Sequence, residues 1–269
     1  MDKNNEDIWG HSEFAAWIFD GATGLSPDAL VAKGEKTDPR WLVEAADESL
    51  KRHADKIEDM HRLYATVVHD CVTAFHKEQT RAPQASYELP MAACIVIRKF
   101  SGRVICGALS DCTMLIETIH GLQRMDPCPK HAVVDDTTRA KMTEAIESGL
   151  SPLEARDHLI PHLRNNRKMA NQPNGYDVFA PDPAVADRAR VETFHPAPEG
   201  HALLMTDGFY ALVDSYNAYD DASLMEAAKS KGLEALYKEL RDIENADSAI
   251  RTYPRFKQSD DATAFLVAV

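Results

Sequence analysis

Short apolar runs of strand length constrain the fold of this chain more than any other feature of its sequence. The run at 91–98 reads MAACIVIR, and the run at 103–109 reads RVICGAL. Both are rich in β-branched residues, and the KFSG between them predicts a hairpin with Gly102 in its turn. Further strands are predicted where similar runs recur, at 14–19, 113–119, 201–208 and 262–269.

Helical stretches separate these runs. Pro39 opens a long one, in which apolar residues recur at spacings of three and four, as on one face of a helix. Whether this stretch forms one helix or two stays open, because residues 51–59 are highly charged. Helices are also predicted over 137–170 and 222–245, and the Pro-, Asn-, Asp- and Gly-rich segment 171–200 predicts a long irregular connection. Strands and helices thus occur in separate groups, which favours an α+β fold over a parallel α/β fold.

Length and composition argue against several classes of protein. With 269 residues, 44% of them apolar, the chain is long enough for one large domain or two small ones. The net charge of −13 argues against nucleic acids and anionic membranes as partners. The first ten residues lack the apolar core of a signal peptide, and no run approaches the roughly 18 apolar residues of a membrane span. The five cysteines lack framework spacing and predict reduced thiols in a cytoplasmic protein.

Acidic residues stand at the ends of the predicted strands. Any one of them can be a simple turn residue, because an Asp side chain bonds nearby backbone amides. The set, in chain order, is Glu6, Asp7, Asp20, Asp111, Asp207, Asp260 and Asp261.

As a group, these carboxylates predict a cation site. Each lies where a buried strand opens, so one edge of a sheet can present several of them. A cluster of carboxylates repels itself and needs a cation, and oxygen ligands favour Mg²⁺ or Mn²⁺ over zinc. Two such ions that share one aspartate activate water for attack on phosphorus. Gly21, directly after Asp20, lets the backbone approach closely, which makes its carbonyl a further candidate ligand.

The motifs that carry these residues resemble those of the metal-dependent protein phosphatase 2C family, also called PPM. They read NNED, FAAWIFDGATG, GALSDCTMLI, HALLMTDGFYALVD and SDDATAFLVAV, and they cover nearly the whole chain in the family's order. The resemblance implies one phosphatase domain over 1–269, built as a four-layer α-β-β-α sandwich with a central antiparallel β-sandwich. It places a variable flap at about 137–200, beside a metal centre at one end of the sandwich.

The same resemblance implies two Mn²⁺ or Mg²⁺ ions and gives each ligand a role. Asp20 would bridge both ions, and the Gly21 carbonyl would bind one of them. Asp207 and Asp260 would hold the first ion. Glu6 would hold the second, directly or through water.

Other acidic residues receive supporting roles from the resemblance. Asp7 would orient metal-bound water, Asp111 would bind a third, weaker ion, and Asp261 would lie just outside the ligands. The implied reaction is hydrolysis of phosphoserine or phosphothreonine in proteins by a metal-activated water, without a covalent enzyme intermediate. By the same resemblance, the catalytic residues would be Asp7 together with Asp20, Asp207 and Asp260, and the last three would act through metal-bound water.

The chain departs from the family's usual pattern at positions that would contact substrate. Ala22 and Thr23 stand where many members carry a histidine that is a candidate general acid. The position of the arginine that binds substrate phosphate is Asp2, and Lys3 is the nearest cation. Because a lysine is a point charge and not a bidentate fork, substrate binding is expected to differ.

A basic cluster in the predicted flap offers replacements for that arginine. The stretch RNNRK contains Arg164 and Arg167, and Tyr176 follows in the rim segment. Cations suit the C-terminal end of a helix, so a solvated helix end is the alternative interpretation of this cluster.

Three functions therefore stay open on the sequence. The first is a serine/threonine phosphoprotein phosphatase. The second is a small-molecule phosphomonoesterase on the same scaffold, for which the absent histidine and arginine leave room. The third is a non-catalytic module that binds a phosphorylated partner, which the retained carboxylates disfavour.

Overall fold

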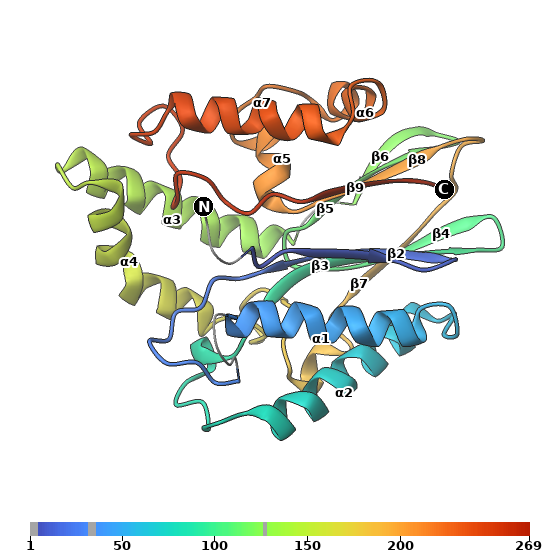
Figure 1. Cartoon of the computed structure of the whole chain (residues 1–269), viewed down its shortest axis with the longest axis horizontal. Coiled ribbons are helices and arrows are strands. Elements are labelled where there is room, and N and C mark those ends of the chain that lie inside the picture. The colour runs from blue at the N-terminus through green and yellow to red at the C-terminus, as the bar shows by residue number, and fades with distance from the viewer. Residues whose placement is uncertain (1–4, 32–35, 126–127) are drawn as a thin grey trace.

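Two antiparallel β-sheets pack face to face in the computed structural model, which describes residues 5–31, 36–125 and 128–269 (Figure 1). The first sheet has the strand order β1 (Ile8–His11), β2 (Ala15–Gly21), β3 (Ala92–Phe100), β4 (Arg103–Leu109) and β7 (Arg190–Phe194). The second sheet has the order β6 (Gly121–Met125), β5 (Thr113–Thr118), β8 (His201–Met205) and β9 (Ala264–Ala268).

Strand β2 shows why these runs are apolar throughout. Ala16 and Ile18 belong to the core between the two sheets, whereas Trp17 and Phe19 belong to the core under the helices. Successive side chains of a strand point to opposite faces, so a strand covered on both faces needs apolar residues at every position. The indole N–H of Trp17 also donates to Asp47 of helix α1 at 2.9 Å, which ties the helix to the sheet.

Helices cover both outer faces of the sandwich. The first sheet is covered by α1 (Asp38–His53) and α2 (Met60–Glu78), and the second by α5 (Asp207–Asp214), α6 (Asp221–Ser230) and α7 (Leu233–Ala246) (Figure 1). The predicted α+β fold with its α-β-β-α layers is confirmed. The charged stretch after Pro39 resolves into two helices, because Asp59 caps the start of the second.

Helices α3 (Pro129–Glu147) and α4 (Pro152–Arg167) lie at one end of the sandwich (Figure 1). Ser151 and Glu154 form the capping box at the start of α4. Short 3₁₀ turns lie at Ser86–Glu88 and Pro183–Val185.

The structure adds strands β1 and β6 to the sequence-based elements and departs from them in three further places. The segment 171–200 is not wholly irregular, because β7 lies within it and pairs with β4. The helix predicted over 222–245 is broken at Gly232, whose φ of +85° suits glycine. A third difference is α5, an eight-residue helix that begins directly at Asp207.

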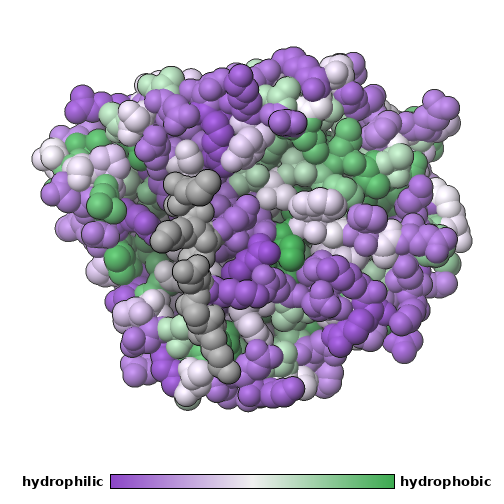
Figure 2. All heavy atoms as spheres, in the orientation of Figure 1, coloured by the Kyte–Doolittle hydropathy of each residue, from purple (hydrophilic) through white to green (hydrophobic). Residues whose placement is uncertain are grey.

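Hydrophilic side chains cover most of the face seen in Figure 2, apart from an apolar area on the side where the sheets lie. At the neighbouring edges of the two sheets, Trp9 of β1 stacks on Phe265 of β9 with their rings 4.8 Å apart. Within the described ranges, every helix is too short or too polar for a membrane span. All five cysteines are free, as predicted.

Candidate active site

The register of the first two strands brings the acidic residues before β1 beside Asp20. Strands β1 and β2 pair antiparallel with Ile8 opposite Phe19, so the residues preceding Ile8 run alongside those following Phe19. The Gly21 N–H donates to the Glu6 carbonyl at 3.3 Å. A Cβ at Gly21 would lie 2.8 Å from that oxygen, so the close approach requires glycine.

The second sheet presents its carboxylates in the same way. Strands β8 and β9 pair antiparallel, which brings Asp207, just after β8, beside Asp260 and Asp261, just before β9. The backbone at Gly208 lies against the Asp261 carbonyl, and a Cβ there would approach that oxygen to 2.0 Å. The separation of the two acidic segments is therefore fixed by backbone contact.

Hydrogen bonds join the two sets across the sandwich. The Thr206 hydroxyl donates to Asp7 Oδ2 at 3.1 Å, and the Glu6 N–H donates to Asp261 Oδ2 at 2.8 Å. The carboxyl groups of Asp20 and Asp207 also lie close enough to interact with each other. Carboxylates that are up to 255 positions apart in the chain thus meet at one end of the two sheets.

Asp111 joins this group from the turn between β4 and β5, where the chain passes from one sheet to the other. Its Oδ2 lies 3.1 Å from Nδ1 of His131 in α3. Burial alone would raise the pKa of Asp111, but the neighbouring His131 ring lowers it below its usual value. The His131 ring in turn packs edge-on against Tyr176, with ring centroids 4.7 Å apart.

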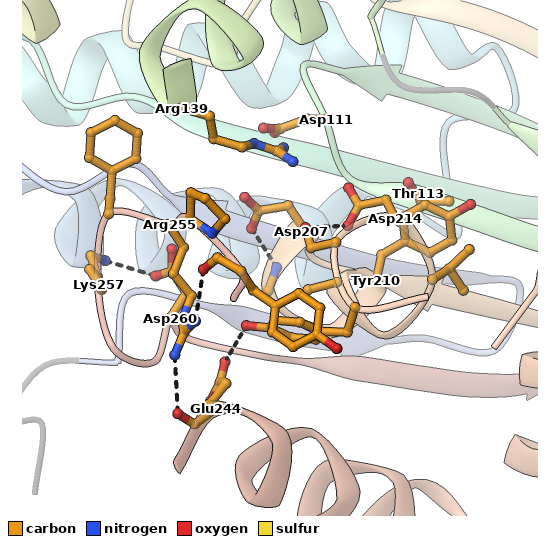
Figure 3. A pocket seen from close by; sticks show the side chains of 18 of the residues that line it. Asp111, Thr113, Arg139, Asp207, Tyr210, Asp214, Glu244, Arg255, Lys257 and Asp260 are labelled. Carbon is orange, nitrogen blue, oxygen red and sulfur yellow. Dashed lines mark hydrogen bonds and ion pairs between the residues drawn. The ribbon is translucent and has the colours of Figure 1, made fainter. Parts of the chain in front are cut away.

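Two cavities open beside the carboxylates. The smaller, about 230 Å³, is lined by Asp20 and Gly21 and by the flap residues Arg167 and Tyr176. The larger, about 530 Å³, is shown in Figure 3, where Arg139 of α3 reaches toward Asp111. Residues that line both cavities are Asp111, Asp207, Phe256, Lys257 and Asp260.

Burial, with the charges of neighbouring carboxylates, raises the pKa values of three carboxyl groups in the cluster. For Asp20 the pKa is well above its usual value because the group is buried and the charges of Asp7, Asp207 and Asp111 lie close by. Burial raises the pKa of Asp7 to about 7, and the charges of two further aspartates add to the effect. The Glu6 carboxyl also has a raised pKa through burial. A cluster in this state favours binding of protons or of a cation.

Comparison with solved structures places this arrangement in a known fold. The chain superimposes over its full length on the serine/threonine phosphatase PstP/Ppp of Mycobacterium tuberculosis, with a TM-score of 0.54, 16% identity and 93% of that chain covered. The chain has the fold of the PPM-type serine/threonine phosphatases. The catalytic domain of PstP in complex with two manganese ions gives a TM-score of 0.53 at 14% identity, with 100% of this chain and 92% of that chain covered.

A third PPM structure extends the comparison. The PPM phosphatase MsPP of Mycobacterium smegmatis, in complex with cacodylate, gives a TM-score of 0.51 at 14% identity, with 100% of this chain and 93% of that chain covered. No family model and no curated protein matches this chain by sequence. The PPM-type fold that the motifs implied is confirmed by the three-dimensional arrangement of the chain.

The chemistry of the carboxylate site fits a hard divalent ion. Its side-chain donors are carboxylate oxygens, and Asp7 Oδ1 is buried with no hydrogen-bond partner. As the side chains lie, however, no three His, Cys, Asp or Glu residues within the described ranges converge as a preassembled metal site. In this arrangement Asp111 Oδ2 lies beside His131, and Asp260 Oδ1 lies beside Lys257.

The predicted substrate-binding residues are placed differently from one another. Lys3 lies outside the described residues. Arg167 lines the smaller cavity, and its Nη1 donates to the Thr23 carbonyl at 2.7 Å. Arg164 instead donates twice to the Leu25 carbonyl, at 2.9 and 3.0 Å, and its guanidinium lies over the Tyr87 ring.

Several residues of the site carry no signal in the sequence. Thr37, the N-cap of α1, donates to Glu6 Oε1 at 2.6 Å. His131, Arg139 and Lys257 reach the carboxylates from α3 and from the loop before β9. A lone histidine or lysine has no motif, so only the fold reveals these contacts.

The raised pKa of Asp7 predicts a pH-dependent gain in stability for Asp7→Asn. A carboxyl whose folded pKa exceeds its unfolded value stabilises the fold fully below the unfolded pKa and loses that contribution as the pH rises through about 7. Neutral Asn avoids this loss. With EDTA present, we expect the free energy of unfolding of the variant to exceed that of the wild type by up to about 4 kcal/mol at pH 8. The difference should be smaller at pH 5. Denaturant unfolding at both pH values measures the difference.

The matched control for that comparison is Asp157→Asn, because Asp157 is exposed on α4. It should leave the free energy of unfolding within about 0.5 kcal/mol of the wild type at both pH values. An Asp7→Asn gain that is equal at pH 5 and pH 8 would contradict the assignment of the shifted pKa to this carboxyl.

Proposed function

We propose that this chain is a metal-dependent serine/threonine phosphoprotein phosphatase, formed by one domain over residues 1–269 and acting in the cytoplasm. The observation that carries the proposal is the meeting of the strand-end carboxylates of both sheets at one end of a PPM-type sandwich. Neighbouring structures with this fold are serine/threonine phosphatases, and one of them is a complex with two manganese ions.

In this proposal the metal ligands are those expected from the motifs. They are Glu6, Asp20, the Gly21 carbonyl, Asp207 and Asp260, with Asp111 for a third ion. Mn²⁺ or Mg²⁺ ions held there supply an activated water and neutralise charge on the phosphoryl oxygens. Asp7 would orient that water, because its buried Oδ1 is available as an acceptor.

Arg167 is the side chain that we propose for binding the substrate phosphate. One nitrogen of its guanidinium is anchored on the Thr23 carbonyl, two residues after Gly21. The group also lies close enough to Glu6 and Tyr176 to interact with them electrostatically. It therefore stands in the wall of the smaller cavity, where its planar fork can donate to two phosphate oxygens.

Replacement of Arg167 by Met tests this role. Removal of charge-assisted hydrogen bonds worth about 1.5–3 kcal/mol should lower kcat/KM for a phosphopeptide by about 10- to 100-fold, mainly through KM. Steady-state kinetics measure the effect. The matched control is Arg103→Met on the exposed part of β4, which should leave both constants unchanged. An Arg167→Met enzyme with a wild-type KM would rule out this phosphate contact.

The function itself is tested by phosphate release from phosphothreonine peptides and from p-nitrophenyl phosphate, with Mn²⁺, Mg²⁺ or EDTA. Metal-dependent hydrolysis of the peptides supports the phosphoprotein phosphatase. Hydrolysis of small esters alone would assign the chain to the small-molecule phosphomonoesterases. Binding of phosphopeptide without turnover under any metal would assign it to the non-catalytic modules.

A further inference from the structure

Lys257 places a positive charge inside the carboxylate cluster. Its Nζ donates to Asp260 Oδ1 at 2.8 Å and to the Thr23 hydroxyl at 3.1 Å. Thr23 belongs to the loop after β2, whereas Asp260 precedes β9, so the ammonium connects the ends of the two sheets. Figure 3 shows the contact between Lys257 and Asp260 at the edge of the larger cavity.

Two more carboxylates lie close enough to the same ammonium to interact with its charge. The charges of Asp261 and Glu6, after that of Asp260, interact favourably with Lys257. Glu6 is 5% exposed, and its Oε1 already accepts a hydrogen bond from Thr37. The single positive charge of Lys257 thus interacts with three carboxylates, those of Asp260, Asp261 and Glu6.

The loop that carries Lys257 is held in place by its own contacts. Arg255 donates to the Gln258 carbonyl at 2.9 Å and forms an ion pair with Asp247 at 2.8 Å. Arg241 of α7 donates to the Asp260 carbonyl at 2.6 Å. The backbone on both sides of Lys257 is therefore fixed, and the side chain is directed to the cluster by the fold.

The residues around the ammonium overlap with the proposed metal ligands. Glu6 is the proposed ligand of the second ion, Asp260 is a proposed ligand of the first, and Thr23 follows the Gly21 carbonyl by two residues. We propose that Lys257 is a built-in cation that competes with a divalent ion for the Glu6 side of the cluster. The inference rests on the proposed function, because it concerns the metal centre of that phosphatase. Binding of the second ion then requires the ammonium to leave, which weakens the affinity for that ion.

Mn²⁺ titration by calorimetry tests the competition. Lys257→Met keeps the length of the side chain and removes the charge, so the weaker of the two Mn²⁺ affinities should rise by about tenfold or more. Lys257→Gln removes the charge but keeps a donor, and should show the same gain. Lys257→Arg keeps the charge and should bind Mn²⁺ like the wild type. The matched control is Lys238→Met on the exposed face of α7, which should leave both affinities unchanged.

The outcomes separate this inference from the proposed function. A gain in Mn²⁺ affinity in both neutral variants supports the inference, even if no variant hydrolyses phosphate esters. Equal Mn²⁺ affinities in the wild type and in every folded Lys257 variant, with circular dichroism as the check on folding, would overturn it. That result would leave the phosphatase intact if metal-dependent hydrolysis were still observed.

Discussion

Asp20→Asn is expected to lose nearly all hydrolysis of phosphate esters while it keeps its fold. Asp20 lies between the carboxylates of the two sheets and is the proposed bridge between metal ions. An amide oxygen is a weaker ligand and carries no charge, so the loss of several kcal/mol of transition-state stabilisation predicts a decrease in kcat of about 10³-fold or more. Initial rates with saturating Mn²⁺ measure the decrease.

Stability provides the check on this result. The pKa of Asp20 is raised by burial and by neighbouring charges, so the neutral amide should leave the melting temperature in EDTA unchanged or higher. Asp157→Asn on α4 should retain both activity and stability. A folded Asp20→Asn enzyme with activity within tenfold of the wild type would contradict the placement of the reaction at this cluster.

The largest effect on stability is expected from Phe19→Ala. Phe19 is fully buried beside Asp20 and meets Phe179 edge-on, with ring centroids 5.2 Å apart. Loss of a buried phenyl ring leaves a cavity and should lower the free energy of unfolding by about 3–5 kcal/mol. Denaturant unfolding measures the loss, and the melting temperature should fall by about 2–4 °C for each kcal/mol.

Phe14→Ala is the matched control, because Phe14 lies just before the same strand and is 43% exposed. It should cost less than about 1 kcal/mol. If the two substitutions destabilised the protein equally, the packing of Phe19 between β2 and the helices would not be the source of the effect.

Burial explains which strands were predictable from the sequence. Strands β2, β3 and β4 are apolar at nearly every position because they are covered on both faces. Edge strands β6 and β7 are partly exposed and carry polar residues, such as Gln123 and Glu192, so they lack that signal. Their pairing depends on neighbours far away in the chain, which a local pattern does not contain.

The same distinction applies to the candidate site. The carboxylates were predictable because each stands at the end of a strand, where its position follows from that strand. Lys257 was not, because its contact with Thr23 spans 234 positions and depends on how the last loop packs. The sequence does not distinguish Arg164 from Arg167, because both lie in one basic cluster. Only the fold shows that they bind different backbone carbonyls.

The division of the ligands between two sheets has a consequence for cohesion of the sandwich. Asp20 belongs to one layer, whereas Asp207 and Asp260 belong to the other. An ion bound by all three carboxylates stabilises the contact between the two sheets at that end by its binding free energy. Saturation with the ion would thus slow amide hydrogen exchange in the ends of β2 and β8 together, although no backbone hydrogen bond between these two strands is formed.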